Sequence, residues 1–286
     1  MDRDDLDAVA ECWAAAVDCV LWGKSDGLLE GVVYPLVGHL LDTAAVAWCG
    51  WDLHLVERQR RAVLRGMGLD PESPADRERA RALVAVWAGW HDLGKIGHFQ
   101  RKDPSAYGRL TGYPPSAGEK LSHGEVTHLL LASALPDTGY DAMGDGLALA
   151  SVARRVAQLL GGHHGRYFTQ PSPRSLRHSV VREQPMGAGK WQEQRLAHLG
   201  AVWSAVGEPV APGVLSVEAA VVVGELVVLS DWLASQEHFV SAQLEGWRLA
   251  GDGALVGHWG RALAGAPALL VGAGLGVPVW TETPLS

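Results

Sequence analysis

Trp90-His91-Asp92-Leu93-Gly94-Lys95 is the segment from which the rest of the chain can be interpreted. A histidine followed by an aspartate is common by chance, but further side chains of the same kinds accompany this pair. They are His39 upstream, and His123, His163, His164 and Asp231 downstream. Neutral imidazole and carboxylate are the usual protein ligands of transition metals, and one residue of each type does not complete a coordination sphere. Together the seven side chains predict a metal centre with enough ligands for two neighbouring ions that share a carboxylate.

A long helix is expected to lead into the His-Asp pair. Ser73 can cap its first turn, Pro74 suits the first helical position, and Asp76 favours the positive end of the helix dipole. From there a helix is predicted over residues 74–91, closed by Gly94, where a left-handed cap would suit glycine. The pair then lies on the last turn, and rigid backbone is what a metal site needs.

Two more candidate ligand segments lie at expected helix ends. Ser122-His123-Gly124-Glu125 is typical of a capping box, which places His123 in the first turn of a helix. The histidine doublet directly follows Gly161-Gly162, the end of a helix expected to begin at Asp141 or Asp145. Adjacent side chains point in different directions on a regular helix, so both imidazoles can serve one site only at such an end.

His39 and Asp231 come from two further expected helices. The helix that carries His39 is predicted to begin near Pro35. Residues 216–235 are apolar on nearly all sides, which predicts the buried central helix. Asp231 lies near its end and needs a partner, because a buried unpaired carboxylate costs several kcal/mol; a metal is the expected one. His128, roughly 140° around its helix from the first-turn histidine, is not counted as a ligand.

This ordered set resembles the dinuclear branch of the HD phosphohydrolase superfamily, and within it the HD nuclease domain of the type I CRISPR-associated nuclease-helicase. The resemblance spans roughly residues 20–250 and rests on three motifs. They are His91-Asp92-Leu93-Gly94-Lys95 followed by Phe99-Gln100, Gly162-His163-His164-Gly165, and Leu229-Ser230-Asp231-Trp232-Leu233-Ala234-Ser235. The resemblance implies an all-α fold, an HD-domain helical bundle with the metal site at converging helix ends.

The resemblance also implies two ligand sets. One ion would be held by His39, His91, Asp92 and Asp231, and the other by Asp92, His123, His163 and His164, with Asp92 as the bridge. Two divalent ions about 4 Å apart can activate a hydroxide near neutral pH and bind the non-bridging oxygens of a phosphodiester. The many imidazoles favour Mn, Fe, Co or Ni over Mg. Lys95 would stabilise charge on the phosphate, or alternatively interact with the helix dipole.

By the same resemblance we expect a cytoplasmic, metal-dependent deoxyribonuclease of antiviral defence. It would degrade single-stranded DNA in CRISPR interference as an endonuclease, with 3'-5' exonuclease activity left open. The implied partners are single-stranded DNA, the CRISPR surveillance complex, and a helicase in cis or in trans. The full family protein carries two helicase lobes after its HD domain, whereas this sequence shows no ATP-binding motif. We therefore expect an HD nuclease domain over residues 1–260 and a tail or linker over residues 261–286.

The charge distribution suggests a surface for nucleic acid. A net charge of −8 argues against a wholesale nucleic-acid binder. Residues 154–195 nevertheless hold eight basic side chains against two acidic ones. The candidates for DNA binding within this segment are Arg166, Arg174, Arg177 and Arg182. A solvated loop would have the same composition, and this alternative stays open.

Composition favours a helical cytosolic protein. Apolar residues make up 48% of the chain, with abundant Ala, Leu and Val, and this usage favours helix over strand. Cys12, Cys19 and Cys49 form no CxxC motif, so a reducing compartment is expected. The first residues lack the features of a signal peptide, no membrane span is expected, and residues 6–22 are predicted to form an amphipathic helix.

Two other functions compete with the nuclease. An HD phosphohydrolase acting on a small nucleotide or a cyclic dinucleotide would use similar ligands. The cyclic-dinucleotide branch usually carries Gly-Tyr-Pro after its histidines, whereas this chain has His164-Gly165-Arg166-Tyr167-Phe168. A non-catalytic recruitment module is the third interpretation, and intact ligands at all seven positions count against it.

Overall fold

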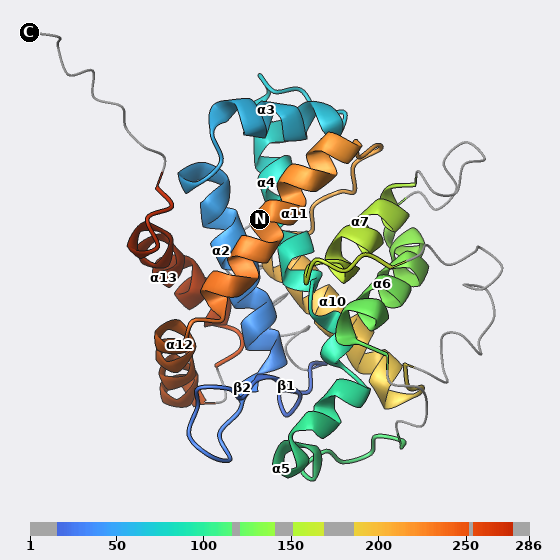
Figure 1. Ribbon diagram of the computed structural model, residues 1–286, viewed down its shortest axis with the longest axis vertical. Coiled ribbons are helices and arrows are strands. Elements are labelled where there is room, and N and C mark those ends of the chain that lie inside the picture. The colour runs from blue at the N-terminus through green and yellow to red at the C-terminus, as the bar shows by residue number, and fades with distance from the viewer. Residues whose placement is uncertain (1–15, 116–120, 141–150, 169–185, 252–253, 277–286) are drawn as a thin grey trace, which may run out of the picture.

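The computed structural model describes residues 16–115, 121–140, 151–168, 186–251 and 254–276. Within these ranges the chain is mostly helical, with one small antiparallel sheet of β1 (Trp22–Lys24) and β2 (Tyr34–Pro35) (Figure 1). The helices are α2 (Leu36–Leu53), α3 (Glu57–Gly66), α4 (Pro74–Trp90), η1 (Leu93–Lys95), η2 (His98–Lys102), α5 (Pro104–Tyr107), α6 (His123–Ala134), η3 (Leu135–Thr138), α7 (Val152–Gly161), α10 (Lys190–Ala205), α11 (Val217–Ala234), α12 (Glu237–Ala250) and α13 (His258–Gly272). The predicted all-α class is confirmed. No helix in these ranges is long and apolar enough to cross a membrane.

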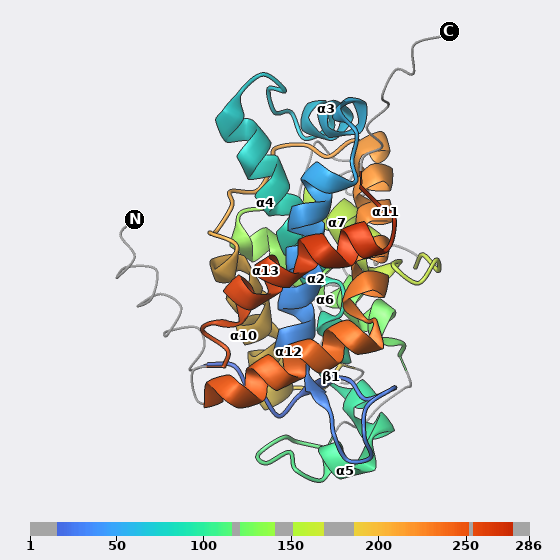
Figure 2. The ribbon, with the colours of Figure 1, turned by 90° about the vertical axis from the view of Figure 1, so that its left-hand side faces the viewer.

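Helix α2 forms the centre of the molecule. Helices α4, α11 and α13 pack around it, as the two perpendicular views show (Figures 1 and 2). Small residues allow this, since a Cβ at Gly50 would lie 2.9 Å from Leu226 Cδ1 of α11. The prediction that residues 216–235 form the buried central helix is wrong, because Val221 and Trp232 of α11 are each 67% exposed. Helix α11 is apolar on nearly all sides, but other helices cover only part of its surface.

The first described residues form turns and a short strand rather than a helix. Residues 16–21 form turns and coil, and Trp22 begins β1, so the helix predicted over residues 6–22 is wrong where the structure describes it. Fully buried Gln100 explains this conformation, because its side chain pairs with the backbone of Trp22. The Trp22 amide donates to Gln100 Oε1 at 3.1 Å, and Gln100 Nε2 donates to the Trp22 carbonyl at 2.9 Å. A tertiary contact therefore fixes the strand.

Helix α4 begins as predicted and ends differently. Ser73 caps it by accepting a hydrogen bond from the Asp76 amide at 3.2 Å. Gly94 lies in the 3-10 turn η1 and is not a left-handed cap. A Cβ at Gly94 would lie 1.9 Å from the His123 carbonyl oxygen and 2.7 Å from the Thr127 amide nitrogen. Glycine is required there because the backbone of α6 approaches so closely.

Helices α6 and α7 form a closely packed pair (Figure 1). They approach at two glycines, since a Cβ at Gly124 would lie 2.6 Å from the Gly161 carbonyl oxygen. Ser151 caps α7, so the start predicted at Asp141 or Asp145 is wrong for this helix; residues 141–150 lie outside the described ranges. The glycine contact fixes the start of α6 beside the end of α7.

The C-terminal part contains a packed helix where sequence reasoning expected a tail or linker over residues 261–286. Helix α13 lies against α2, and its His258 Nε2 is 2.9 Å from Asp42 Oδ1 of that helix. Tyr34 donates to the other Asp42 oxygen at 2.6 Å, and all three side chains are buried. Buried polar groups need hydrogen-bond partners, and α13 supplies one of them. Residues 277–286 lie outside the described ranges.

Candidate metal centre

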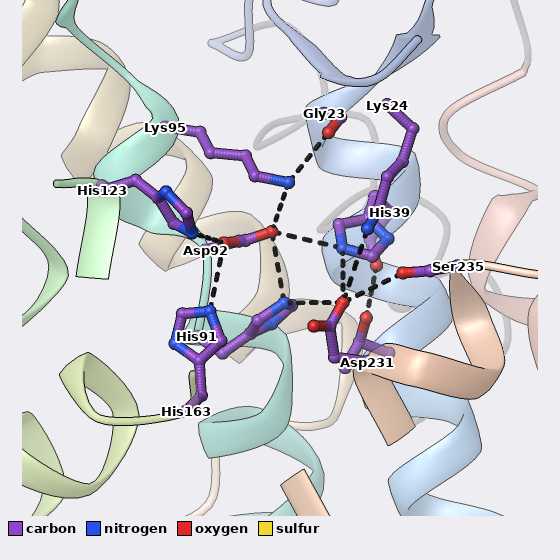
Figure 3. Close-up of polar contacts among 12 residues, drawn as sticks. Gly23, Lys24, His39, His91, Asp92, Lys95, His123, His163, Asp231 and Ser235 are labelled. Carbon is purple, nitrogen blue, oxygen red and sulfur yellow. Dashed lines mark hydrogen bonds and ion pairs between the residues drawn. The ribbon is translucent and has the colours of Figure 1, made fainter. Parts of the chain in front are cut away.

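All seven predicted ligands meet where helix ends converge. Figure 3 shows six of them, and His164 lies next to His123. His39 lies in the first turn of α2, His91 and Asp92 follow α4, His123 begins α6, His163 and His164 follow α7, and Asp231 lies in the last turn of α11. Their potential ligand atoms form two groups, and within each group all atoms lie within 4.8 Å of one another.

All four residues of the first group belong to the buried part of the molecule, and they supply two carboxylates and two imidazoles. His39 Nε2 lies 3.3 Å from Asp92 Oδ2 and 3.3 Å from Asp231 Oδ1. His91 Nε2 lies 3.3 Å and 3.4 Å from the same two oxygens. Ser235, in the motif quoted above, donates to Asp231 Oδ1 at 3.0 Å and orients that carboxylate. Four donor atoms thus surround one small space.

The second group consists of three histidines next to the other oxygen of Asp92. His123 Nε2 and His164 Nε2 are 2.8 Å apart. Asp92 Oδ1 lies 3.4 Å from His123 Nε2 and 3.6 Å from His163 Nε2. The Asp92 carboxylate therefore stands between the groups, with one oxygen directed at each.

The histidine tautomers fit metal binding. Nδ1 of His91 lies 2.7 Å from the Ala88 carbonyl oxygen, and Nδ1 of His163 lies 2.6 Å from that of Leu160. A carbonyl only accepts, so each Nδ1 carries a proton, and in the neutral imidazole the lone pair then belongs to Nε2. Among the described residues, buried atoms without a hydrogen-bond partner include Nε2 of His39, His91 and His163 and Oδ1 of Asp92. Two of these atoms, Nε2 of His39 and of His91, belong to the first group, and the other two face the second group. Buried atoms of this kind suit divalent cations.

Electrostatics also favour a cation at this place. Burial opposes the charged form of His91, but Asp92 and Asp231 outweigh it and raise its pKa to about 9. Burial lowers the pKa of His123 to about 3, despite the nearby Asp92. Burial would raise the pKa of Asp92, yet Lys95 and His91 hold it well below its usual range. The carboxylates are therefore ionised at neutral pH, and a bound cation would replace the proton on His91.

Two lysines contact the carboxylates (Figure 3). Lys95 Nζ lies 2.6 Å from Asp92 Oδ2 and donates to the Gly23 carbonyl at 2.8 Å. These contacts differ from the alternative in which Lys95 interacts with the carbonyl end of α4. Lys24 Nζ lies 3.7 Å from Asp231 Oδ1. The ammonium groups neutralise part of the carboxylate charge.

An open cavity of about 280 Å³ gives access to this centre. It is lined by Trp22, Gly23, Lys24, Ser25, Asp26, Asp92, Lys95, Phe99, Lys102, His123, His164 and Asp231. Both groups of candidate ligands therefore reach the cavity, and a substrate in it would meet lysines as well as the metal site.

A family model described as "Cas3, HD domain" matches residues 22–240. The chain belongs to the Cas3 HD family. The CRISPR-associated endonuclease/helicase Cas3 of Thermus thermophilus is 31% identical over 223 residues, which are 75% of this chain and 22% of that protein. A chain in a structure described as a CRISPR RNA-guided surveillance complex, pre-nicking, matches with a TM-score of 0.76 and 37% identity over 90% of this chain and 29% of that one. The Thermus thermophilus Cas3 HD domain in the presence of Ni²⁺ matches with a TM-score of 0.60 and 26% identity over 95% and 94%.

The chain corresponds to the HD domain and not to the full length of its longer relatives. The chain spans about a fifth of the length of the Thermus thermophilus protein, 22%, and nearly the whole of the separate HD domain, 94%. The family assignment therefore concerns the HD domain. The His/Asp cluster fits binding of divalent metal, and one relative's structure was obtained with Ni²⁺.

The basic segment contributes less surface charge to this Cas3 HD chain than its composition suggests. Arg154 and Arg195 are buried, and Arg195 donates to three backbone carbonyls, so neither adds to a positive surface. Arg166 is exposed, with its guanidinium 5.7 Å from the centre of the Phe168 ring, and is not among the residues that line the cavity. Arg174, Arg177 and Arg182 lie outside the described residues. DNA binding by these four arginines stays a prediction.

Sequence reasoning missed the outer residues of the cavity. Lys24 and Lys102 were not singled out, and Phe99 was quoted only as part of a motif. The available signal for Lys24 was the polar break Gly23-Lys24-Ser25-Asp26-Gly27, which ends an apolar segment. That break does not reveal that Lys24 lies beside Asp231, because the two residues meet only in the folded chain.

Proposed function

We propose that this Cas3 HD chain is a metal-dependent nuclease that cuts single-stranded DNA in CRISPR interference, using two divalent ions. The observation that carries the proposal is the position of Asp92. One oxygen of its carboxylate faces His39 and His91, and the other faces His123 and His163. A pair of ions that share one ligand requires such a bridging carboxylate.

The two candidate groups divide the ligands between the ions. His39, His91, Asp92 and Asp231 would hold one ion, and Asp92, His123, His163 and His164 the other. When bound, two such ions supply an activated water and positive charge for the non-bridging oxygens of a phosphodiester. The backbone carbonyls that bind Nδ1 of His91 and His163 keep those rings in the ligand orientation.

We assign Lys95 the role of stabilising negative charge on the substrate phosphate. Its ammonium is nearly buried and lies 2.6 Å from Asp92 Oδ2, at the surface of the cavity. With metal ions bound to the carboxylates, the Lys95 ammonium would be free of that ion pair and would stabilise negative charge on the substrate. Its hydrogen bond to the Gly23 carbonyl keeps it at the cavity.

The donor set favours Mn, Fe, Co or Ni as the native metal. Five of the seven candidate ligands are imidazoles, which suit these ions better than Mg, whose preferred ligands are oxygens. The relative studied with Ni²⁺ supports this choice.

We also assign two partners, the CRISPR surveillance complex and a helicase that acts in cis or in trans. The support is that one relative is described as an endonuclease/helicase and another belongs to a structure of a surveillance complex. Unwinding by a helicase would deliver the single strand that the nuclease cuts.

A phosphohydrolase acting on a small nucleotide is the second candidate. The observation in its favour is the cavity volume of about 280 Å³, at the lower limit of small-ligand sites. It would hydrolyse a mononucleotide or a cyclic dinucleotide and leave circular single-stranded DNA intact.

Metal analysis and a cleavage assay on circular single-stranded DNA test the proposal together. We expect two metal ions per chain after loading with Mn or Ni, and conversion of the circle to fragments, which requires endonuclease activity. Adding a linear strand labelled at its 5' end reveals 3'-5' trimming. Asp92→Asn keeps the shape of the side chain and removes its charge, so it should lose metal and cleavage. A metal-loaded chain that leaves both the circular and the linear DNA intact would refute the nuclease, and hydrolysis of small nucleotides by that chain would favour the second candidate.

A further inference from the structure

The cavity beside the candidate metal centre has an outer wall that metal binding does not explain. Its inner wall consists of candidate ligands, whereas β1 and η2 supply the outer wall. The large outer side chains are Trp22, Lys24, Phe99 and Lys102. Aromatic rings combined with lysines are typical of sites that bind single nucleic-acid strands, where bases stack on rings and ammonium groups bind phosphates.

Phe99 is the residue on which this outer wall is built. Its ring is half-buried and lies 4.9 Å from that of Trp22, between ring centres, and 5.3 Å from that of His123 in an edge-on arrangement. The ammonium groups of Lys102 and Lys95 lie 4.6 Å and 5.1 Å from its centre. Neighbouring rings therefore hold Phe99 in place. One lysine before it in the sequence and one after it bring positive charge close to the ring.

We propose that Phe99 stacks on a base of the substrate strand, and that Lys24 and Lys102 bind the phosphates that flank that nucleotide. This proposal rests on the proposed nuclease function. It specifies how the site would bind the nucleotide next to the scissile phosphate. A cavity of about 280 Å³ suits one nucleotide rather than a duplex.

A base can take the place that Lys102 holds over the ring. Lys102 is exposed, so its ammonium is hydrated and its attraction to the ring is weak. Stacking of a base on an aromatic side chain is the stronger interaction. Once a base displaces it, the Lys102 ammonium can pair with a phosphate. The base then stacks on Phe99 while Lys102 binds the backbone of the same strand.

Lys24 is held on the other side of the same subsite. It ends β1, whose Trp22 is fixed by three hydrogen bonds with Gln100, the residue next to Phe99. The positions of Lys24 and Phe99 are therefore linked through one buried side chain. Lys24 Nζ lies 3.7 Å from Asp231 Oδ1, and the Lys24 side chain is 24% exposed. Lys24 is therefore next to the metal centre and accessible to a phosphate.

Binding to two strands of equal length separates the base from the phosphates. Fluorescent oligo-dT and an oligonucleotide of stable tetrahydrofuran abasic units are titrated with the full chain in EDTA, which prevents cleavage. We expect wild type to bind oligo-dT about 5- to 150-fold more tightly than the abasic strand, as one stacked base predicts. Phe99→Leu should abolish this ratio and Phe99→Trp should restore it. Lys24→Met should weaken binding of both strands and reduce the log-log salt slope by about one.

Phe168→Leu is the matched control. Phe168 is also half-buried, with a histidine ring edge-on to it and the Arg166 guanidinium 5.7 Å from its centre, but it does not line the cavity. It should keep the wild-type ratio. The proposal is overturned if wild type binds both strands equally, or if Phe99→Leu keeps the ratio. Because these titrations contain no metal and involve no cleavage, an inactive wild-type chain would refute the nuclease while leaving the stacking result to be judged separately.

Discussion

Gly94→Ala should damage one half of the metal centre and spare the other. The added Cβ would lie 1.9 Å from the His123 carbonyl oxygen, and Cβ atoms essentially never approach another heavy atom within 3.0 Å. The separation must therefore grow by more than 1 Å. Because the obstacle is the backbone of α6, no side-chain rotation relieves it, and the start of α6 has to move away from η1.

The displacement acts on the ligand at the start of that helix. His123 Nε2 lies 3.4 Å from Asp92 Oδ1, so a shift of more than 1 Å separates them. The two hydrogen bonds of Thr127 to Gly94 and His91 would also be strained. Overpacking of this kind costs about 1–3 kcal/mol in unfolding free energy. A misplacement of about 1 Å can reduce turnover by about 10²-fold.

Metal content and activity are measured on the same preparation. We expect Gly94→Ala to retain one ion per chain, held by the buried group around His39, and to lose most cleavage of single-stranded DNA. Gly200→Ala is the control, since a Cβ at Gly200 has no neighbour within 4 Å and alanine suits the interior of α10. Two ions and full activity in Gly94→Ala would show that α6 is not fixed by this contact, and the reasoning would be refuted.

Three further predictions follow from particular side chains. Asp92→Ala should lose metal and abolish cleavage, whereas His128→Ala should keep both and lose only stability, because His128 is buried outside the two ligand groups; equal metal loss in the two variants would contradict the assignment. Replacing Arg166, Arg174, Arg177 and Arg182 by Ala should weaken DNA binding at low salt and flatten its salt dependence by roughly one log-log unit per lost contact, with hydrolysis of bis-p-nitrophenyl phosphate near wild type; an unchanged salt slope would make the loop a solvated surface. Burial lowers the pKa of His198 from 6.5 to about 4, so below pH 6.5 the unfolded chain binds a proton that the folded chain does not. The free energy of unfolding therefore falls by up to about 3 kcal/mol as the pH drops from 6.5 to about 4. Urea unfolding at pH 7 and pH 5 should show that His198→Gln lacks this part of the pH dependence. If the variant keeps the wild-type pH dependence, His198 is not its source.

The sequence by itself was sufficient to predict which side chains lie together at the centre and where several helices begin. Seven side chains of metal-binding type, in a fixed order at expected helix ends, predicted which residues would meet, and all seven do meet. Ser73 and Ser122 each cap a helix as predicted. A cap is a contact between residues about three positions apart, so its signal is present in the local sequence.

Only the tertiary structure decided which segments surround one another. Helices α2 and α11 are both largely apolar, and the partners that pack on them made α2 the centre. Asp42 on α2 is satisfied by His258, which turns an expected tail into a core helix. Gly94 is required by the backbone of α6, and Lys24 reaches Asp231. These contacts join residues far apart in the chain, and neither periodicity nor capping signals extend that far; burial and proximity arise only when the helices pack.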